Sequence, residues 1–116
     1  MKRGDVFMAI VKFTEGVGSK RRPVVIVQAN RFNSSLPDTL VAGVTSQMAL
    51  IGPSNRFLID PTTSDGAQSG LDYSSVVRCD RLSTIARSTV GRRLGHLSPA
   101  HLAQLDACLR SSLDLL

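Results

Sequence analysis

Two short apolar runs, rich in β-branched and aromatic residues, open the chain. They are residues 5–13 (DVFMAIVKF) and 23–28 (PVVIVQ), each bounded by glycine or by charged residues. This pattern is typical of strands that pack in a core. Residues 14–22, between them, contain glycine and end on the basic run KRR. They predict a hairpin loop longer than a tight turn, and functional residues often lie on such loops.

Strand patterns continue through the middle of the chain, separated by polar segments. The apolar and β-branched runs predict further strands at residues 39–46, 56–60, 75–78, 83–86 and 90–97. In the last of these runs, Gly91 and Gly95 argue against a helix. Residues 30–38 and 61–70 are polar and rich in turn-forming residues, so they predict loops.

The carboxy-terminal segment predicts an amphipathic helix. Ser98 is a favourable N-cap, and Pro99 suits the first helical position. The residues that follow carry one apolar stripe, formed by Leu102, Leu105, Leu109 and Leu113. Such a stripe covers one face of a small sheet. The chain is therefore expected to be mainly β with a C-terminal helix.

Length and charge narrow the organisation and the class of partner. With 116 residues, the chain is long enough for one core and too short for two ordinary domains, so we expect one domain over residues 1–116. Lysine and arginine number 14 against 9 acidic residues, a net charge of +5. This surplus favours a polyanionic partner, but charge alone does not choose between nucleic acid and an anionic membrane.

The amino terminus superficially has the pattern of a signal peptide, because basic residues precede an apolar run. Lys12 and Glu15 interrupt that run early, it is shorter than the length of about 20 residues that spans a membrane, and no small-residue cleavage site follows. We therefore expect a cytoplasmic protein that does not enter a membrane.

The cysteines and histidines do not form a recognisable metal signature. Cys79 and Cys108 match no ligand spacing, and His96 and His101 lie far from Cys79 in sequence. Phosphate-binding loops of the Walker type and paired metal-binding carboxylates are also absent from the sequence. We expect free, partly buried thiols and a protein that works without a metal or another cofactor.

A series of short motifs, spread over nearly the whole chain, resembles the MazF/PemK family of toxins. The first three motifs are GDVF at residues 4–7, GS with RPVVIV at residues 18–27, and VAGVTSQ at residues 41–47. The later ones are GL at residues 70–71 with SVV at 75–77, Asp80 with TI at residues 84–85, and residues 91–97 just before the predicted helix. Each motif alone is common by chance. Their order over the right length carries the resemblance.

The resemblance implies an SH3-like β-barrel with appended helices, the CcdB/MazF/PemK toxin fold, acting as a homodimer. It also implies a metal-independent endoribonuclease that cleaves single-stranded RNA by attack of the 2′-OH, leaving a 2′,3′-cyclic phosphate and a 5′-OH. In that family an arginine before proline and a threonine at the end of the third strand are catalytic, and Arg22 and Thr45 occupy these positions. The implied partner is a cognate antitoxin with an acidic, disordered tail.

The chemistry of Arg22 and Thr45 fits this role. A guanidinium binds phosphate with two parallel hydrogen bonds and stabilises charge that develops on its oxygens. The Thr45 hydroxyl can hold a nonbridging oxygen. The pKa of arginine lies far above neutral, so proton transfer by Arg22 rests on the resemblance alone.

The residues beside the catalytic pair predict an RNA-binding surface, formed by Ser19, Lys20, Arg21, Ser46 and Gln47. Lysine and arginine would bind the RNA backbone, and each such contact makes affinity more salt-dependent. Ser46 and Gln47 are placed to read base edges in an unpaired strand. Tyr73 and Phe32 are candidates for stacking on bases, although Phe32 fits the core equally well.

Two departures from the family pattern keep alternatives open. Relatives tend to carry a glutamate in the loop before the arginine, where this chain has Lys20, and Asp-Gln-Ile-Arg where it has residues 80–83 (DRLS). The general acid and base, and the RNA sequence that is cut, therefore stay open. The alternative function is a non-enzymatic toxin of the same fold that inhibits DNA gyrase through an exposed terminal helix, residues 113–116. A catalytically weakened regulator is a third possibility.

Overall fold

The computed structural model describes residues 1–12 and 19–116, so most of the predicted hairpin loop lies outside the described residues. The elements are β1 (Asp5–Lys12), β2 (Ser19–Ile26), α1 (Asn30–Asn33), β3 (Asp38–Thr45), η1 (Met48–Leu50), β4 (Arg56–Ile59), α2 (Ser64–Ala67), β5 (Ser75–Ala86), η2 (Arg87–Thr89), β6 (Val90–His96) and α3 (Pro99–Leu113). The prediction of a mainly β chain that ends in a helix is confirmed.

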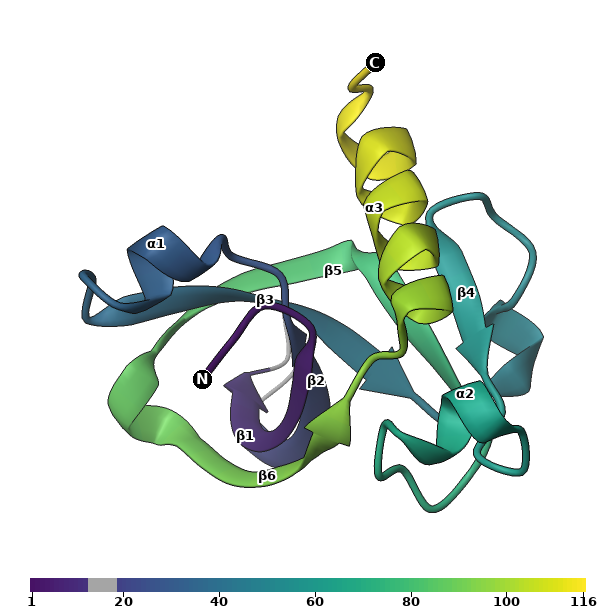
Figure 1. Ribbon diagram of the computed structural model, residues 1–116, viewed down its shortest axis with the longest axis horizontal. Helices are drawn as coiled ribbons and strands as arrows, with labels where there is room; N and C mark the ends of the chain where they lie inside the picture. The colour runs from purple at the N-terminus through teal and green to yellow at the C-terminus, as the bar shows by residue number, and fades with distance from the viewer. Residues whose placement is uncertain (13–18) are drawn as a thin grey trace.

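The strands form one antiparallel sheet in the order β4-β5-β3-β2-β1-β6. Figure 1 shows the sheet curving, with β5 sweeping round through the η2 turn into β6 while β1 and β2 lie inside that curve. The helix α3 follows β6 and lies beside β4 and β5. Because the sheet curves, both of its faces can be covered, one by α3 and one by the strands inside the curve.

Two separate apolar clusters fill these two faces. Along β2, Val24 and Ile26 pack in a small cluster inside the curve, whereas Val25 packs in the larger cluster under α3. Successive side chains of a strand point to opposite faces, so both faces of β2 are buried. This explains why the sequence shows a continuous apolar run there rather than an alternating one.

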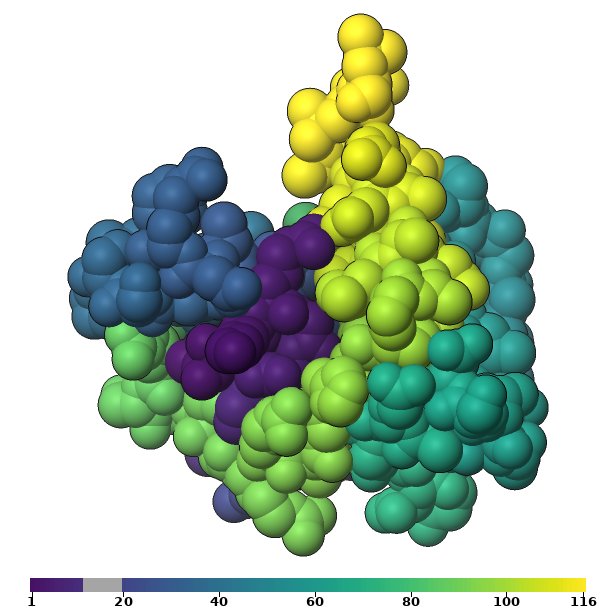
Figure 2. Space-filling view, viewed as in Figure 1, coloured from purple at the N-terminus to yellow at the C-terminus, as the bar shows by residue number. Residues whose placement is uncertain are grey.

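The helix α3 begins as predicted. The Ser98 hydroxyl accepts a hydrogen bond from the His101 backbone N–H at 3.1 Å, and Pro99 occupies the first turn. Leu105 is fully buried, but Leu113, predicted in the same stripe, is 53% exposed. Figure 2 shows why: the last turn of α3 stands clear of the rest of the surface.

Three predicted boundaries are wrong, for identifiable reasons. β2 begins at Ser19 rather than residue 23, because its polar start pairs with β1 from Lys12↔Ser19 onward. Short helices α1 and α2 interrupt the two predicted loops, and the Thr63 hydroxyl caps α2 by accepting from the Gly66 N–H at 3.0 Å. The predicted strands 75–78 and 83–86 are two halves of the single strand β5.

A bulge joins these two halves of β5. Arg78 pairs with Gly43 of β3, and the next pair is Leu82 with Ala42, so residues 79–81 lie outside the ladder. Cys79 turns into the core under α3 and is 1% exposed. Asp80 and Arg81 line a hollow beside β2 and β3. The bulge therefore places charged side chains of β5 near the ends of two other strands.

Candidate active site

The ladder between β2 and β3 ends just before Arg22 and Thr45. The last pair is Val24↔Gly43, and Pro23, next along β2, has no N–H with which to continue the ladder. Extending the antiparallel register by two residues puts Arg22 across from Thr45. The two predicted catalytic residues thus lie on neighbouring strands, just beyond the last pair that joins β2 to β3.

Two hollows meet beside Arg22 and Thr45. The first hollow, of about 360 Å³, lies towards β5 and is lined by apolar residues of β1, β2, β3 and β5 together with Gln47, Arg78, Asp80 and Arg81. The second hollow, of about 680 Å³, lies between the end of β2, β6 and the segment before β5, and its polar lining includes Lys20, Arg21, Ser46, Asp72, Tyr73 and Arg92. Four residues line both hollows: Arg22, Pro23, Val44 and Thr45.

A network of ion pairs holds the polar wall of the first hollow. Asp80 accepts hydrogen bonds from Arg78 at 3.1 and 2.7 Å and from Arg56 at 3.3 and 2.8 Å. Arg56 also donates to the Leu50 carbonyl at 2.9 Å. The hydrogen bonds from Arg78, with those from Arg56, hold the pKa of Asp80 well below its usual range, and Asp80 raises the pKa of Arg78. The Asp80 carboxylate is therefore a weak base.

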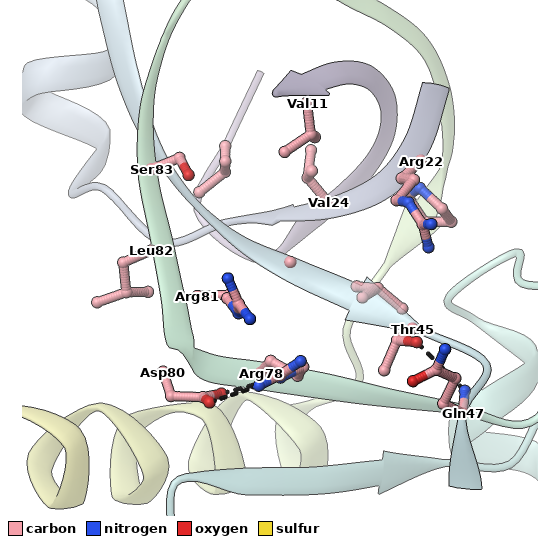
Figure 3. A pocket seen from close by; sticks show the side chains of 14 residues that line it. Val11, Arg22, Val24, Thr45, Gln47, Arg78, Asp80, Arg81, Leu82 and Ser83 are labelled. Carbon is pink, nitrogen blue, oxygen red and sulfur yellow. Dashed lines mark hydrogen bonds and ion pairs between the residues drawn. The ribbon is translucent and has the colours of Figure 1, made fainter. Parts of the chain in front are cut away.

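The Thr45 hydroxyl has a fixed orientation. Its oxygen accepts a hydrogen bond from the Gln47 backbone N–H at 3.2 Å. A hydroxyl has one hydrogen to donate besides its acceptor sites, so Thr45 can still donate to an oxygen in the hollow. Figure 3 shows this hydroxyl on one side of the first hollow, with the side chains of Arg22, Arg78 and Arg81 arranged around the same space.

The predicted RNA-binding residues fall on both sides of the pair. Lys20, Arg21 and Ser46 line the second hollow, and Gln47 lines the first. Ser19 belongs to β2, but its side chain lies outside the described residues. Tyr73 lines the second hollow, whereas Phe32 lies on α1 and lines neither. Their roles in RNA binding stay predictions.

Three arginines of the site were missed by the sequence reasoning. Arg78 and Arg81 line the first hollow and Arg92 lines the second. The sequence signal available was the basic Arg81 within residues 80–83, a departure from the family pattern. Nothing in the sequence showed that a bulge in β5 brings this segment to Arg22 and Thr45.

The described lining of the two hollows is strongly basic. It holds the six cations Lys20, Arg21, Arg22, Arg78, Arg81 and Arg92 against the two acids Asp72 and Asp80. A concave surface of one charge sign concentrates ligands of the opposite sign. The site is therefore suited to a ligand with several negative charges, such as a nucleic-acid strand.

The thiols and the histidines lie away from this site. Within residues 1–12 and 19–116, both cysteines are free and buried, which confirms the prediction of free thiols, although the burial is deeper than expected. Burial raises the pKa of the Cys79 thiol to about 12. His101 is buried against the Phe57 ring, and neither it nor His96 lines a hollow.

The described residues offer neither a cluster of metal ligands nor a membrane-spanning helix. No group of three or more His, Cys, Asp or Glu side chains there is arranged to hold a metal ion. No helix in the described part of the chain has both the length and the apolar character needed to cross a membrane.

Comparison with known sequences identifies a family over most of the chain. The family model for PemK-like, MazF-like toxins of type II toxin–antitoxin systems matches residues 2–113. A probable endoribonuclease MazF of Mycolicibacterium smegmatis is 31% identical over 94% of this chain and 93% of its own length. Endoribonuclease EndoA of Bacillus subtilis is 28% identical over 100% of this chain and 97% of its own length.

Solved structures agree in fold. The Mycobacterium tuberculosis toxin MazF-mt6 superposes with a TM-score of 0.78 and 26% identity, covering 97% of this chain and 98% of its own. A mycobacterial endoribonuclease solved in complex with its cognate antitoxin gives a TM-score of 0.79 at 21% identity, covering 100% of this chain and 97% of its own. These likenesses confirm the expected toxin fold. The chain belongs to the PemK-like, MazF-like toxin family of type II toxin–antitoxin systems.

Proposed function

We propose that this protein, an endoribonuclease toxin of the PemK/MazF family, cuts single-stranded RNA where the two hollows meet, with Arg22 and Thr45 as the catalytic pair. The observation that carries this proposal is the position of the pair. Arg22 and Thr45 come from neighbouring strands, lie across from each other and line both basic hollows. A strand of RNA crossing between the hollows passes over them.

The reaction is an internal transesterification. The 2′-oxygen attacks the adjacent phosphorus, the bond to the 5′-oxygen breaks, and the products are a 2′,3′-cyclic phosphate and a 5′-OH. The 2′-OH loses its proton, and the leaving 5′-oxygen gains one. Arg22 and the Thr45 hydroxyl donate hydrogen bonds to the nonbridging oxygens, on which charge builds as the bond forms, and such stabilisation is usually the largest catalytic contribution.

The site offers few groups for the proton transfers. Asp80, the carboxylate of the first hollow, has a depressed pKa because of Arg78 and Arg56, so it is a poor general base. Neither His96 nor His101 lines a hollow. The described lining of the second hollow also holds the titratable side chains of Lys20, Asp72 and Tyr73, so the general acid and base are not assigned to a single residue. No step of this scheme uses a metal ion.

RNA binding is assigned to residues on both sides of the pair. Lys20, Arg21 and Ser46 bind the strand in the second hollow, and Gln47 binds it in the first. Ser19, next to Lys20 in the sequence, is assigned to the same RNA-binding set. The exposed ends of Lys20 and Arg21 suit phosphate contacts. With RNA as its substrate, the toxin acts in the cytoplasm.

Two protein partners belong to the proposal: a second copy of the chain in a homodimer, and a cognate antitoxin whose acidic, disordered segment covers the basic hollows. The family, toxins of type II toxin–antitoxin systems, supports the antitoxin, and one solved relative is an endoribonuclease in complex with its cognate antitoxin. The homodimer rests on the resemblance noted from the sequence motifs. Light scattering should give the mass of two chains, and a monomer would contradict the dimer. Antitoxin binding should weaken with salt, so a salt-independent complex would count against a charged cover.

Cleavage in the presence of EDTA tests the function directly. Purified protein is incubated with a diverse pool of single-stranded RNA, alongside Arg22→Ala and Thr45→Ala. The wild type should cut and leave 2′,3′-cyclic phosphate ends, and Arg22→Ala should lower kcat by about 100-fold or more, as loss of a charge-stabilising donor does. An intact RNA pool, or cleavage that neither substitution changes, would overturn the proposal.

One observation favours a second candidate, inhibition of DNA gyrase by binding. That function requires an exposed end of the terminal helix, and Leu113, Leu115 and Leu116 are indeed exposed beyond the body of the protein. The basic hollows and the endoribonuclease relatives favour RNA cleavage instead. A gyrase supercoiling assay on the same preparation separates the two functions. A slow but Arg22-dependent cleavage would identify a weakened enzyme.

A further inference from the structure

We propose that the Tyr73 ring is a stacking platform for one unpaired base of the RNA, in the second hollow, with Arg21 and Arg92 binding the phosphate next to that base. The proposal deepens the proposed function and rests on it, because it takes RNA to cross Arg22 and Thr45. It assigns a substrate-positioning role to a loop outside the catalytic strands.

Tyr73 is the only tyrosine of the chain, and it is 74% exposed. A single exposed ring is common on protein surfaces and does not by itself indicate a binding site. The position of this ring is more informative, because Tyr73 lines the same hollow as Arg22 and Thr45. Every nucleobase has a flat face that stacks on an aromatic ring, so such a contact suits single-stranded RNA.

The loop that carries Tyr73 is held on both sides of the ring. Before it, Gly70 has a φ of +71°, and a Cβ there would lie 1.9 Å from the Leu94 carbonyl oxygen of β6, so the loop backbone packs directly on that strand. Leu71 is buried in the core under α3. After it, the Ser75 hydroxyl donates to the Tyr73 carbonyl at 2.9 Å. A ring presented on a fixed backbone loses little conformational entropy when it binds a base.

The cations of the second hollow are placed for phosphate. Lys20, Arg21 and Arg92 line it, and none of the three forms an ion pair with a described carboxylate. The Arg21 guanidinium lies over β6, where a Cβ on Gly91 would come within 3.2 Å of Nη2. Asp72 is the one acid in the described lining. Cations that no described carboxylate neutralises are suited to bind a backbone phosphate beside a stacked base.

The two hollows differ in a way that makes the proposal specific. None of the described residues that line the first hollow is aromatic. Because Arg22 and Thr45 lie between the hollows, nucleotides on the two sides of the cut enter different surroundings. Stacking on Tyr73 should therefore concern a base on one side of the cut only.

The test combines substitutions in the whole protein with single changes in the RNA. The substrate is an oligonucleotide that contains a cleavage site found by sequencing the cut ends, and its variants each lack one base near the cut. Tyr73→Ala should raise KM about 10-fold with kcat little changed, in line with the usual contribution of base stacking. Tyr73→Phe should behave as the wild type, because its ring still stacks. Phe32→Ala removes an exposed ring that lines neither hollow, so it should leave KM unchanged; a rise equal to that of Tyr73→Ala would contradict stacking in the second hollow.

The RNA variants locate the contact. In the wild type, removal of one base on one side of the cut should raise KM as Tyr73→Ala does, and the two changes together should cost no more than either alone. The proposal is overturned if Tyr73→Ala leaves KM unchanged, or if its effect adds to the loss of every base. It is also overturned if Tyr73→Ala cuts RNA normally but loses affinity for the antitoxin, since the ring would then belong to the partner interface.

Failure of this proposal is distinguishable from failure of the proposed function. If cleavage depends on Arg22 and Thr45 but not on Tyr73, only the stacking proposal fails. If the wild type cuts no RNA, binding to an uncleavable oligonucleotide with 2′-deoxyribose at each position decides the matter by fluorescence anisotropy. Equal affinity of the wild type and Tyr73→Ala, or absence of binding, then overturns the stacking proposal as well.

Discussion

The two hollows that meet at Arg22 and Thr45 hold their positive charge in different ways. In the first, Arg78 is tied to Asp80, which Arg56 also binds. In the second, Lys20, Arg21 and Arg92 have no ion pair with a described carboxylate. Cations in an ion-pair network keep a fixed geometry, whereas unpaired exposed cations adapt to a ligand and respond to salt. We therefore expect the first hollow to keep a defined shape and the second to attract an RNA strand through its charge.

The largest effect is expected at the junction that the two hollows share. Arg22→Lys keeps the positive charge but loses the planar fork that binds two phosphate oxygens together. We expect kcat to fall about 100-fold, because the stabilisation of charge in the transition state depends on that geometry. The measurement is single-turnover cleavage of a defined oligonucleotide. A lysine variant as fast as the wild type would show that charge alone is enough at this position.

The next effect should appear in the stability of the protein, which we expect a substitution in the first hollow to lower more than one in the second. Asp80→Asn leaves Arg56 and Arg78 side by side without their carboxylate, and we expect the free energy of unfolding to drop by about 1–3 kcal/mol. Asp72→Asn, in the second hollow, is the matched control because Asp72 forms no ion pair with another described residue. It should change stability by less than about 0.5 kcal/mol. Urea unfolding measures both. Equal losses of stability in the two variants would contradict the idea that ion pairs stabilise the first hollow more than the second.

The pH dependence gives an independent check on Asp80. Its folded-state pKa is lowered from 3.8, chiefly by the hydrogen bond from Arg78. A lowered pKa means that the stabilisation is fully present above pH 3.8 and is lost as the pH falls through the folded-state value. The wild type should therefore lose stability in acid more steeply than Asp80→Asn does. Parallel acid profiles for the two proteins would argue that the network contributes nothing.

The sequence predicted most of the strands because burial follows their apolar runs. It placed the start of β2 four residues late, since Ser19 to Arg22 carry no apolar signal and become a strand through pairing with β1. The short helices α1 and α2 were missed because four residues are too few to show helical periodicity. In both cases the deciding contacts are distant in sequence.

The lining of the candidate site likewise contains residues that the sequence predicted and residues that it did not. Arg22 and Thr45 were predicted from motifs on adjacent strands, and extending the register of β2 and β3 brings these two residues together. Arg78 and Arg81 reach the first hollow through a bulge in β5, where the register slips by three residues. Such a slip depends on how β5 follows the curve of the sheet and on the packing of Cys79 under α3. Apolar periodicity along a single strand does not contain that information.

The smallest expected effect concerns salt. If Arg92 binds a phosphate in the second hollow, Arg92→Ala should weaken RNA binding and make the slope of log affinity against log salt shallower by about 0.7, the value for one phosphate contact in a single strand. Arg110→Ala, on an exposed position of α3 that lines neither hollow, carries the same charge change and should leave the slope as it is. Binding of an uncleavable RNA over a range of salt concentrations gives both slopes. If the two variants lower the slope equally, the net charge of the protein governs capture and the second hollow has no special part in it. If only Arg92→Ala does so, the strand is held in the second hollow, and the contrast between the two hollows extends from stability to RNA binding.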